Sequence, residues 1–280
     1  MSSTPCDDFL RWALPELRMQ WPPFRRVRRQ VCRRITARMA ALDLRSFAEY
    51  RAYLEQHEEE WERLDDYFRI TISRMYRDAP VFDAIRQWLP GAAERSSKPL
   101  RIWSAGAASG EEPYTLAILC RETLPADQAN EAQIYASEAD PHLIKRARRA
   151  RYAEETLKEL PTEWRQNAFV RRADGDEPYQ LHESYRQMVV FRNEDIRYSM
   201  PPGPFNLVLC RYVLMYFDEQ LQLQLLSRIS ECIKPGGLLV LGKRDPEPID
   251  DLPLKPIDRA LRIYRRMATA GPRTPEVWPD

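Results

Sequence analysis

The stretch RIWSAGAASGEEPYTL, residues 101–116, runs from an apolar strand pattern through small residues into the start of a helix. Gly106, Gly110 and the alanines between them carry little or no side chain, so the backbone can approach a bound ligand closely. The amides that follow open a helix whose N-terminus favours anionic groups, either a ligand carboxylate or Glu111 and Glu112 themselves. The pattern is typical of a nucleotide-binding turn, and a purely structural turn is the alternative.

Beyond this stretch, short apolar or β-branched runs alternate with helix-like segments. The runs span residues 101–105, 133–137, 188–192, 205–210 and 238–242, and the helix-like segments span 113–123, 141–150 and 219–233. This alternation predicts an α/β domain with a parallel sheet covered on both faces. Ligands of such sheets bind at the carboxyl ends of the strands, near the switch in strand order, and residues 101–116 should lie there.

The N-terminal part of the chain has apolar residues at three- and four-residue spacing, which indicates helices. Residues 24–42 predict an amphipathic helix, Ser46 is expected to cap a second helix, and residues 61–68 predict a third. The outer face of the first helix is strongly basic, with Arg25, Arg26, Arg28, Arg29, Arg33, Arg34 and Arg38. We therefore expect an all-helical domain over residues 1–90 and the α/β domain over residues 99–280.

Two kinds of irregular segment complete this division. Residues 163–187 are polar and turn-rich, so a small antiparallel β insertion is expected there within the α/β domain. The proline-rich residues 21–23 and 271–280 are expected to be frayed.

The charges nearly cancel, with 43 Lys and Arg against 42 Asp and Glu, so the net charge indicates neither a nucleic acid nor a membrane as a partner. No apolar run approaches the ~20 residues of a membrane-spanning helix, and the N-terminus lacks the pattern of a secretory signal. We therefore expect a soluble, cytoplasmic protein without membrane insertion.

The cysteines and histidines do not form recognisable metal or disulfide patterns. The five cysteines are odd in number, widely spaced and without a CxxC pair, and we interpret them as reduced thiols: Cys6, Cys32, Cys120, Cys210 and Cys232. The three histidines lie far apart without metal-ligand spacing, so no metal centre is expected.

Several polar residues near the predicted strand ends are candidates for binding or catalysis. Glu138 follows the second strand, about 30 residues beyond Gly106, which suits an acidic residue that binds a ribose diol; capping the helix that begins at residue 141 is the alternative. Arg211 lies within the apolar run LVLCRYVLMYF and must have a partner or a ligand, because an isolated buried charge is costly. Tyr216 follows it, with a core position as the alternative. Arg77 adjoins the linker and either reaches across the domain junction or is solvated.

In this order, the motifs resemble those of the chemotaxis receptor glutamate O-methyltransferases, the CheR-type family, which use S-adenosylmethionine. The resemblance runs from about residue 33 to residue 267. It is carried by RRITARMAALDLRSFAEYRAYL, TISRMYRD, WSAGAASGEEPYTLA, ASEAD with RARRARY, PFNLVLCRYVLMYFDEQ and KPGGLLVLG. The pattern WSAGxxxGEEPY is far more specific than a generic glycine turn.

The resemblance implies a Rossmann-like class I methyltransferase domain, preceded by a small all-helical domain and carrying a small antiparallel β insertion. It implies that Arg77 and Tyr216 place the acceptor carboxylate against the methyl group. It implies contacts to S-adenosylmethionine from Ser73 and Arg77 on the helical side, Gly106 and Glu112 at the amino-acid end, Glu138 at the ribose, Asp195 and Ile196 at the adenine, and Cys210 and Arg211 beneath the sulfonium. Methyl transfer to a carboxylate uses a nucleophile that is already ionised, so positioning dominates over acid and base catalysis.

The resemblance also implies a partner. In this family the basic N-terminal helices dock against the acidic methylation region of receptor coiled coils, and the face from Arg25 to Arg38 would serve that role. Contact with nucleic acid and plain solvation are the alternatives.

The chain departs from the family pattern mainly on the acceptor side. Thr71, Ser73, Met75 and Tyr76 stand where the family has Asn, Thr and a double Phe, Tyr212 stands where it has Asn, and residues 243–245 (Lys-Arg-Asp) replace His-Ser-Glu. The alternatives to a receptor glutamate methyltransferase are therefore a CheR-like enzyme for a small molecule or another protein, and a non-catalytic cofactor-binding module.

Overall fold

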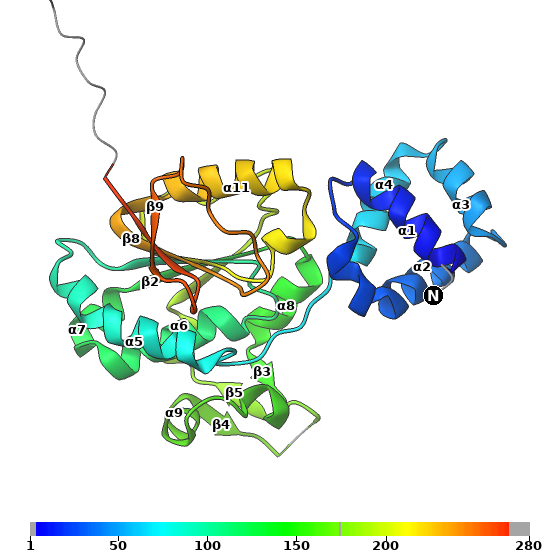
Figure 1. Cartoon of the computed structure of the whole chain (residues 1–280). Coiled ribbons are helices and arrows are strands. Elements are labelled where there is room, and N and C mark those ends of the chain that lie inside the picture. The colour runs from blue at the N-terminus through cyan, green and yellow to red at the C-terminus, as the bar shows by residue number, and fades with distance from the viewer. Residues whose placement is uncertain (1–3, 174, 269–280) are drawn as a thin grey trace, which may run out of the picture.

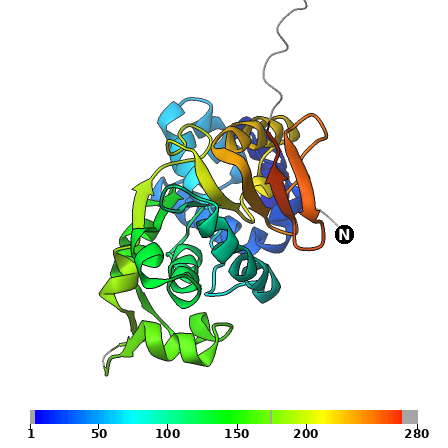
Figure 2. The same cartoon turned by 90° about the vertical axis from the view of Figure 1, so that its left-hand side faces the viewer.

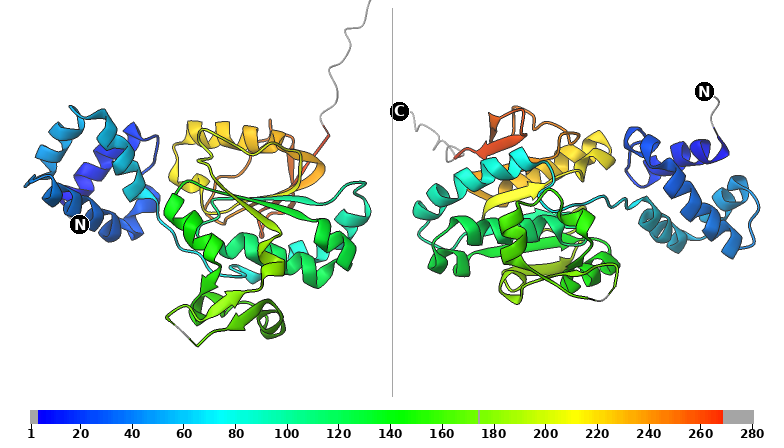
Figure 3. Two further views of the ribbon diagram at one scale, coloured as in Figure 1. Left: turned by 180° about the vertical axis from the view of Figure 1, so that it is seen from behind. Right: turned by 90° about the horizontal axis from the view of Figure 1, so that it is seen from below.

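The computed structural model describes residues 4–173 and 175–268, and it has a helical part beside an α/β part (Figure 1). An extended segment, residues 69–78, leads from the helical part to the first helix of the α/β part (Figure 3). Within these described residues, none of the helices combines the length and the apolar composition needed to cross a membrane.

The helical part contains one helix ahead of those that the sequence pattern predicted. It consists of α1 (Pro5–Glu16), the short turn η1 (Pro22–Arg26), α2 (Arg28–Ala41), α3 (Phe47–Leu54) and α4 (Glu58–Phe68). The helix α1 was not predicted, although Thr4 caps it in a capping box. Ser46 caps α3, as expected, by accepting a hydrogen bond from the backbone N–H of Glu49.

The prediction that residues 21–23 are frayed is wrong. Pro22 and Pro23 are the first residues of η1, a position where the missing N–H of proline costs nothing. They also place Phe24 in the core, where it is fully buried. The expected helix over residues 24–42 is thus divided into η1 and α2. Residues 271–280 lie outside the described residues.

A disulfide bond joins Cys6 on α1 to Cys32 on α2, so the prediction that all five cysteines are reduced is wrong. The two residues are 26 positions apart in the sequence, but the packing of α1 brings their Cα atoms to 6.2 Å. Sequence spacing alone could not reveal this, because the prediction lacked α1. Cys120, Cys210 and Cys232 are free thiols.

The main sheet has seven strands in the order β6-β2-β1-β7-β8-β10-β9. The strands are β1 (Arg101–Ala105), β2 (Gln133–Glu138), β6 (Val189–Asn193), β7 (Phe205–Cys210), β8 (Ile233–Leu241), β9 (Leu254–Asp258) and β10 (Ile263–Arg266). The first five are parallel, and β10 and β9 add an antiparallel edge that the sequence pattern did not predict. The chain runs outward from β1 through β2 to β6 and returns to β7 on the other side of β1, so the switch in strand order lies at β1 and β7.

Helices cover both faces of this sheet, as the alternating pattern predicted (Figures 1 and 2). The helices α5 (Ala79–Glu94), α6 (Glu111–Thr123) and α8 (Pro141–Arg149), with the short α7 (Ala126–Glu131), pack on one face against Ile102 and Leu207. On the other face, α11 (Glu219–Glu231) and the whole helical part share one continuous apolar core with Trp103 and Val208. The helical part is therefore an extension of the core of the α/β part.

A small antiparallel sheet lies apart from the main one, as expected (Figure 2). It consists of β3 (Arg151–Tyr152), β5 (Tyr179–Leu181) and β4 (Phe169–Arg171), with β5 in the centre. The short helices η2 (Glu154–Leu157), α9 (Thr162–Ala168) and α10 (Glu183–Arg186) accompany these strands. Its first strand follows α8 directly and precedes residues 163–187.

The disulfide bond makes a direct prediction for thiol chemistry. Titration of the denatured, unreduced protein with a thiol reagent should count three free thiols, because Cys6 and Cys32 are bonded to each other. Prior reduction should raise the count to five, which is the total number of cysteines in the sequence. A count of five without reduction would instead support the interpretation drawn from the sequence.

Candidate active site

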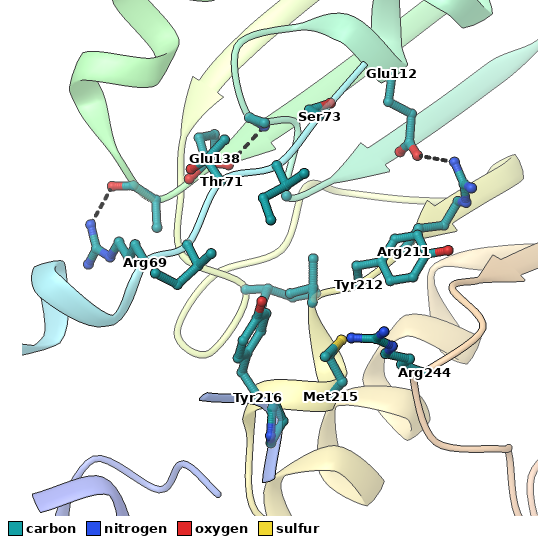
Figure 4. Close-up of a pocket in the computed structure, with 18 of the residues that line it drawn as sticks. Arg69, Thr71, Ser73, Glu112, Glu138, Arg211, Tyr212, Met215, Tyr216 and Arg244 are labelled. Carbon is teal, nitrogen blue, oxygen red and sulfur yellow. Dashed lines mark hydrogen bonds and ion pairs between the residues drawn. The ribbon is translucent and has the colours of Figure 1, made fainter. Parts of the chain in front are cut away.

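A cavity of about 570 Å³ lies at the carboxyl ends of β1, β2 and β7, and residues of the helical part close one side of it (Figure 4). Its walls come from η1, the extended segment 69–77, the turn after β1, the segments after β2 and β6, and the segment after β7. Nine of the ten residues predicted for the site line it: Ser73, Arg77, Gly106, Glu112, Glu138, Asp195, Ile196, Arg211 and Tyr216. Cys210 is the exception, because it is fully buried in β7 behind the wall of the cavity.

The turn after β1 presents backbone to the cavity. Its residues Gly106, Ala108 and Gly110 all have positive φ angles, of 74°, 51° and 94°. The amides of Gly106 and Ala107 donate hydrogen bonds to the carbonyl of Ser137, which fixes the turn against β2. A Cβ atom at Gly106 would come within 2.5 Å of the side chain of Val213, so only glycine allows this close approach.

Glu138 ends β2 with its carboxylate beside this turn. One oxygen accepts the amide of Ala108 at 2.9 Å, and the other accepts the amide of Asp140 at 3.0 Å. The helix cap is a different residue, because Asp140 accepts the amide of His142 at the start of α8. Each oxygen of Glu138 has a further lone pair, which suits two ligand hydroxyls. Burial raises the pKa of the Glu138 carboxyl, and the two backbone amides oppose that shift.

Arg211 forms a buried ion-pair cluster below the cavity. Its guanidinium contacts Glu112 at 3.1 Å and Asp78 at 2.6 Å, and it donates to the carbonyl of Arg77 at 2.9 Å. The sequence left open whether Arg211 has a protein partner or a ligand. The structure shows salt bridges to protein carboxylates, and these lie at the wall of the cavity. Burial alone would raise the pKa of Asp78, but the hydroxyl of Tyr212 and the charge of Arg211 hold it below its usual range.

Asp195 and Ile196 follow β6 and line the same cavity. Arg197 holds the carboxylate of Asp195 at 2.7 Å and reaches Asp65 of α4 at 2.6 Å. Arg69 adds a second link from α4, because its guanidinium donates to the carbonyl of Ala139 after β2. The position of Asp195 is therefore tied to the position of the helical part.

The two predicted catalytic residues reach the cavity from different segments of the chain. Arg77 comes from the extended segment, and its guanidinium lies over the ring of Tyr212 with Cζ 3.9 Å from the ring centroid. Tyr216 comes from η3 (Leu214–Tyr216), with its ring against Phe24 and its hydroxyl directed into the cavity (Figure 4). Burial raises the pKa of the Tyr216 hydroxyl, so this group is a neutral phenol at neutral pH.

Asp245 organises the site but was not among the predicted residues. This buried carboxylate accepts the backbone amides of Tyr212, Met215 and Gly242, and so joins the end of β8 to the segment that carries Arg211 and Tyr216. Burial raises its pKa to about 6. In the sequence, residues 243–245 stand out only as a departure from a family pattern. Two of the three hydrogen bonds of Asp245 come from backbone amides of Tyr212 and Met215, far away in the sequence, and such bonds leave no local signal.

The cavity fits an adenosyl group with a charged amino-acid tail. Its volume falls within the ~300–1,000 Å³ usual for small-molecule sites. Glu138 offers free lone pairs to a ribose. Glu194, also on the wall, has a buried carboxylate oxygen without a hydrogen-bond partner in the described part of the chain. In the described residues, no group of three or more His, Cys, Asp or Glu side chains could hold a metal ion.

A parallel sheet with a glycine turn after its first strand and an acidic residue after its second defines a Rossmann-like nucleotide-cofactor enzyme. Comparison with known proteins specifies the class. The family model "CheR methyltransferase, SAM binding domain" matches residues 71–252, and "CheR methyltransferase, all-alpha domain" matches residues 27–68. The chain belongs to the CheR methyltransferase family and is an S-adenosylmethionine-dependent methyltransferase. The fold class, the family and the cofactor predicted from the sequence are thereby confirmed.

Three relatives illustrate the similarity. The chemotaxis protein methyltransferase of Escherichia coli (strain K12) is 32% identical over 224 residues, which cover 77% of this chain and 75% of that protein. The chemotaxis protein methyltransferase of Listeria monocytogenes is 30% identical over 214 residues, covering 76% and 79%. The chemotaxis protein methyltransferase 2 of Pseudomonas aeruginosa is 31% identical over 215 residues, covering 75% of each.

Replacing Glu138 by alanine should weaken the binding of S-adenosylmethionine at least about tenfold, because each hydrogen bond to a carboxylate contributes ~1.5–3 kcal/mol. Isothermal titration calorimetry with S-adenosylhomocysteine measures this directly. The matched control is Glu131→Ala, which removes an exposed glutamate at the end of α7. Equal affinity of the two variants would contradict the position of Glu138 at the cofactor.

The raised pKa of Asp245 makes a prediction for stability against pH. The folded protein binds this proton more tightly than the unfolded chain, in which the carboxyl titrates at its ordinary value of 3.8. The contribution of Asp245 to the free energy of unfolding is therefore greatest below about pH 4 and declines as the pH rises through about 6. The difference between a pKa of about 6 in the folded protein and 3.8 in the unfolded chain corresponds to ~3 kcal/mol.

Denaturant unfolding of the native protein and of Asp245→Asn at several pH values tests this. The native protein should lose stability relative to the variant, by up to ~3 kcal/mol, between pH 4 and pH 7. The difference between the two free energies isolates Asp245 from other buried carboxyls. A difference that does not change with pH would contradict the raised pKa.

Proposed function

We propose that this protein transfers the methyl group of S-adenosylmethionine to glutamate side chains of chemoreceptor proteins and forms methyl esters. The observation that carries the proposal is that Arg77 and Tyr216 reach the same cavity as the ribose-binding candidate Glu138, but from other elements. The printed names of the three relatives, all chemotaxis protein methyltransferases, support the choice of acceptor.

The proposed roles follow from the positions in the cavity. Glu138 would bind the ribose, and Asp195 and Ile196 would lie at the adenine. Gly106, Glu112 and Ser73 would surround the amino-acid end, and Arg211 would form the adjoining wall. Cys210, being buried, would act only as packing behind that wall.

When bound, S-adenosylmethionine supplies an activated methyl group on a sulfonium. Arg77 would hold the acceptor carboxylate, because the planar fork of a guanidinium fixes a carboxylate in one orientation. The ring of Tyr216 would lie near the positive charge and contribute a cation–π attraction of ~0.5–2 kcal/mol. The cavity walls would exclude water. No general base is needed, because the acceptor is already ionised at neutral pH.

Charged side chains on the cavity walls suit this reaction. Glu138, Glu194 and Asp195 lie at the side of β2 and β6. Four of the lining cations have no ion pair within 4 Å in residues 4–173 and 175–268: Arg26, Arg77, Lys243 and Arg244. These cations are suited to an acidic acceptor.

We further propose that the basic face of η1 and α2 docks an acidic helical partner, such as the cytoplasmic domain of a chemoreceptor. The structure limits which arginines are available. Arg38 is paired with Glu60 at 2.7 Å, and Arg34 donates to the carbonyls of Tyr67 and Arg69. The exposed arginines of this face are Arg25, Arg26, Arg28, Arg29 and Arg33. With such a partner the protein would act in the cytoplasm. We further propose that its two domains comprise residues 1–90 and 99–280.

Incubation with methyl-labelled S-adenosylmethionine and receptor cytoplasmic fragments tests the proposal. Label should appear in the receptor and be released as methanol by mild base, because esters are base-labile. Arg77→Ala should reduce turnover at least tenfold, whereas the matched control Arg149→Ala, an exposed arginine at the end of α8, should not. Base-stable label would exclude an ester. Label found only in other proteins or metabolites would mean a different acceptor.

A further inference from the structure

We infer that Tyr212 is a positioning residue for the acceptor, because its ring serves as a platform that orients the guanidinium of Arg77. The inference rests on the proposed function only in giving Arg77 the acceptor carboxylate as its ligand.

Three features fix the position of Tyr212. Its hydroxyl donates to Asp78 at 2.6 Å, and its backbone amide donates to the buried carboxylate of Asp245. A Cβ atom at Gly242 would come within 3.0 Å of the ring and 2.7 Å of the amide, so Tyr212 can occupy this position only because residue 242 has no side chain. The guanidinium of Arg77 lies over the ring at 3.9 Å. The platform is thus held at its hydroxyl, at its backbone and beside its ring.

The backbone at this cluster adopts conformations that the surroundings must impose. Tyr76, Asp78 and Tyr212 are not glycines, yet their φ angles are 59°, 63° and 61°. A left-handed conformation is unfavourable for such residues and persists only where neighbouring contacts over-determine it. Asp78 provides those contacts, because it binds both the Tyr212 hydroxyl and the guanidinium of Arg211.

Arg77 needs this platform because little else restrains it. The one hydrogen bond of its side chain to a described residue goes from Nη1 to the carbonyl of Ile72 at 2.6 Å. It has no ion pair with any carboxylate in the part of the chain that the structure describes, although it lines the cavity. A long side chain loses conformational entropy when it is ordered, and this loss opposes binding. Stacking on a fixed ring removes part of that cost before the acceptor binds.

The experiment combines a double-mutant cycle with a spectroscopic measurement. Tyr212→Leu should lower kcat/KM for the methyl acceptor about tenfold, and Tyr212→Phe should stay within about threefold of the native protein because it keeps the ring. Affinity for S-adenosylhomocysteine should change less than twofold in both. In the Arg77→Ala background, Tyr212→Leu should have no further effect, since the ring acts through Arg77. A further loss there, or a native rate for Tyr212→Leu, would overturn the inference.

NMR of the Arg77 side-chain Nε–H group gives a measure that does not depend on turnover. The aromatic ring should shift this resonance in the native protein and in Tyr212→Phe, and the shift should vanish in Tyr212→Leu. An unchanged resonance in Tyr212→Leu would contradict the stacking. If the resonance behaves as expected but receptors are not esterified, the platform stands and the proposed acceptor fails. If receptors are esterified and the resonance does not respond, only the platform fails.

Discussion

The buried guanidinium of Arg211 is the constraint on which the site depends. It lies at the end of β7, at the switch in strand order, and only 7% of the residue is exposed. A charge in that place must be compensated, and removal of one partner of a buried pair costs ~3–5 kcal/mol. Glu112 at the start of α6 and Asp78 before α5 provide the compensation. The cluster therefore fixes three separate segments of chain around the same point of the cavity, and each of them carries a residue proposed to bind cofactor or acceptor.

The cavity also depends on the helical part, which supplies one of its walls. The apolar core of the helical part continues into the α11 face of the sheet, and Arg197 bridges Asp65 of α4 to Asp195. On the opposite side, Gln20 donates from its backbone to the carbonyl of Tyr216 and from its side chain to that of Met215. Apolar packing, ion pairs and hydrogen bonds to the backbone therefore all link the helical part to the walls of the cavity. A displacement of the helical part would therefore move Tyr216 and Asp195 together.

Much of the α/β part could be predicted from the sequence, because its strands are buried on both faces. The limits of β1 and β7 match the predicted runs 101–105 and 205–210 residue for residue. The hairpin of β9 and β10 was missed because its strands are short and mix apolar with charged residues, as in the edge strand Leu254–Asp258. At the site, nine of the ten predicted residues line the cavity, which followed from motif order. Asp245 could not be predicted, since its three partners are backbone amides. The sequence also could not show that Arg38 is unavailable on the basic face, because its ion pair with Glu60 forms only when α2 packs against α4.

Under the proposed function, the arrangement around Arg77 also bears on the rate of the reaction. A carboxylate anion and a sulfonium cation react to give two neutral groups, so charge is lost on the way to the transition state. A cation that bound the carboxylate as strongly as possible would stabilise the reactants more than the transition state and slow the step. Arg77 shares its charge between the ring of Tyr212 and the carbonyl of Ile72. It can therefore orient the acceptor through its remaining N–H groups while binding it less tightly than a free guanidinium would. The same reasoning applies to Arg211 and Arg197. Their short ion pairs, at 2.6 Å, are made with the protein's own carboxylates, so these two charges are not available to bind the acceptor.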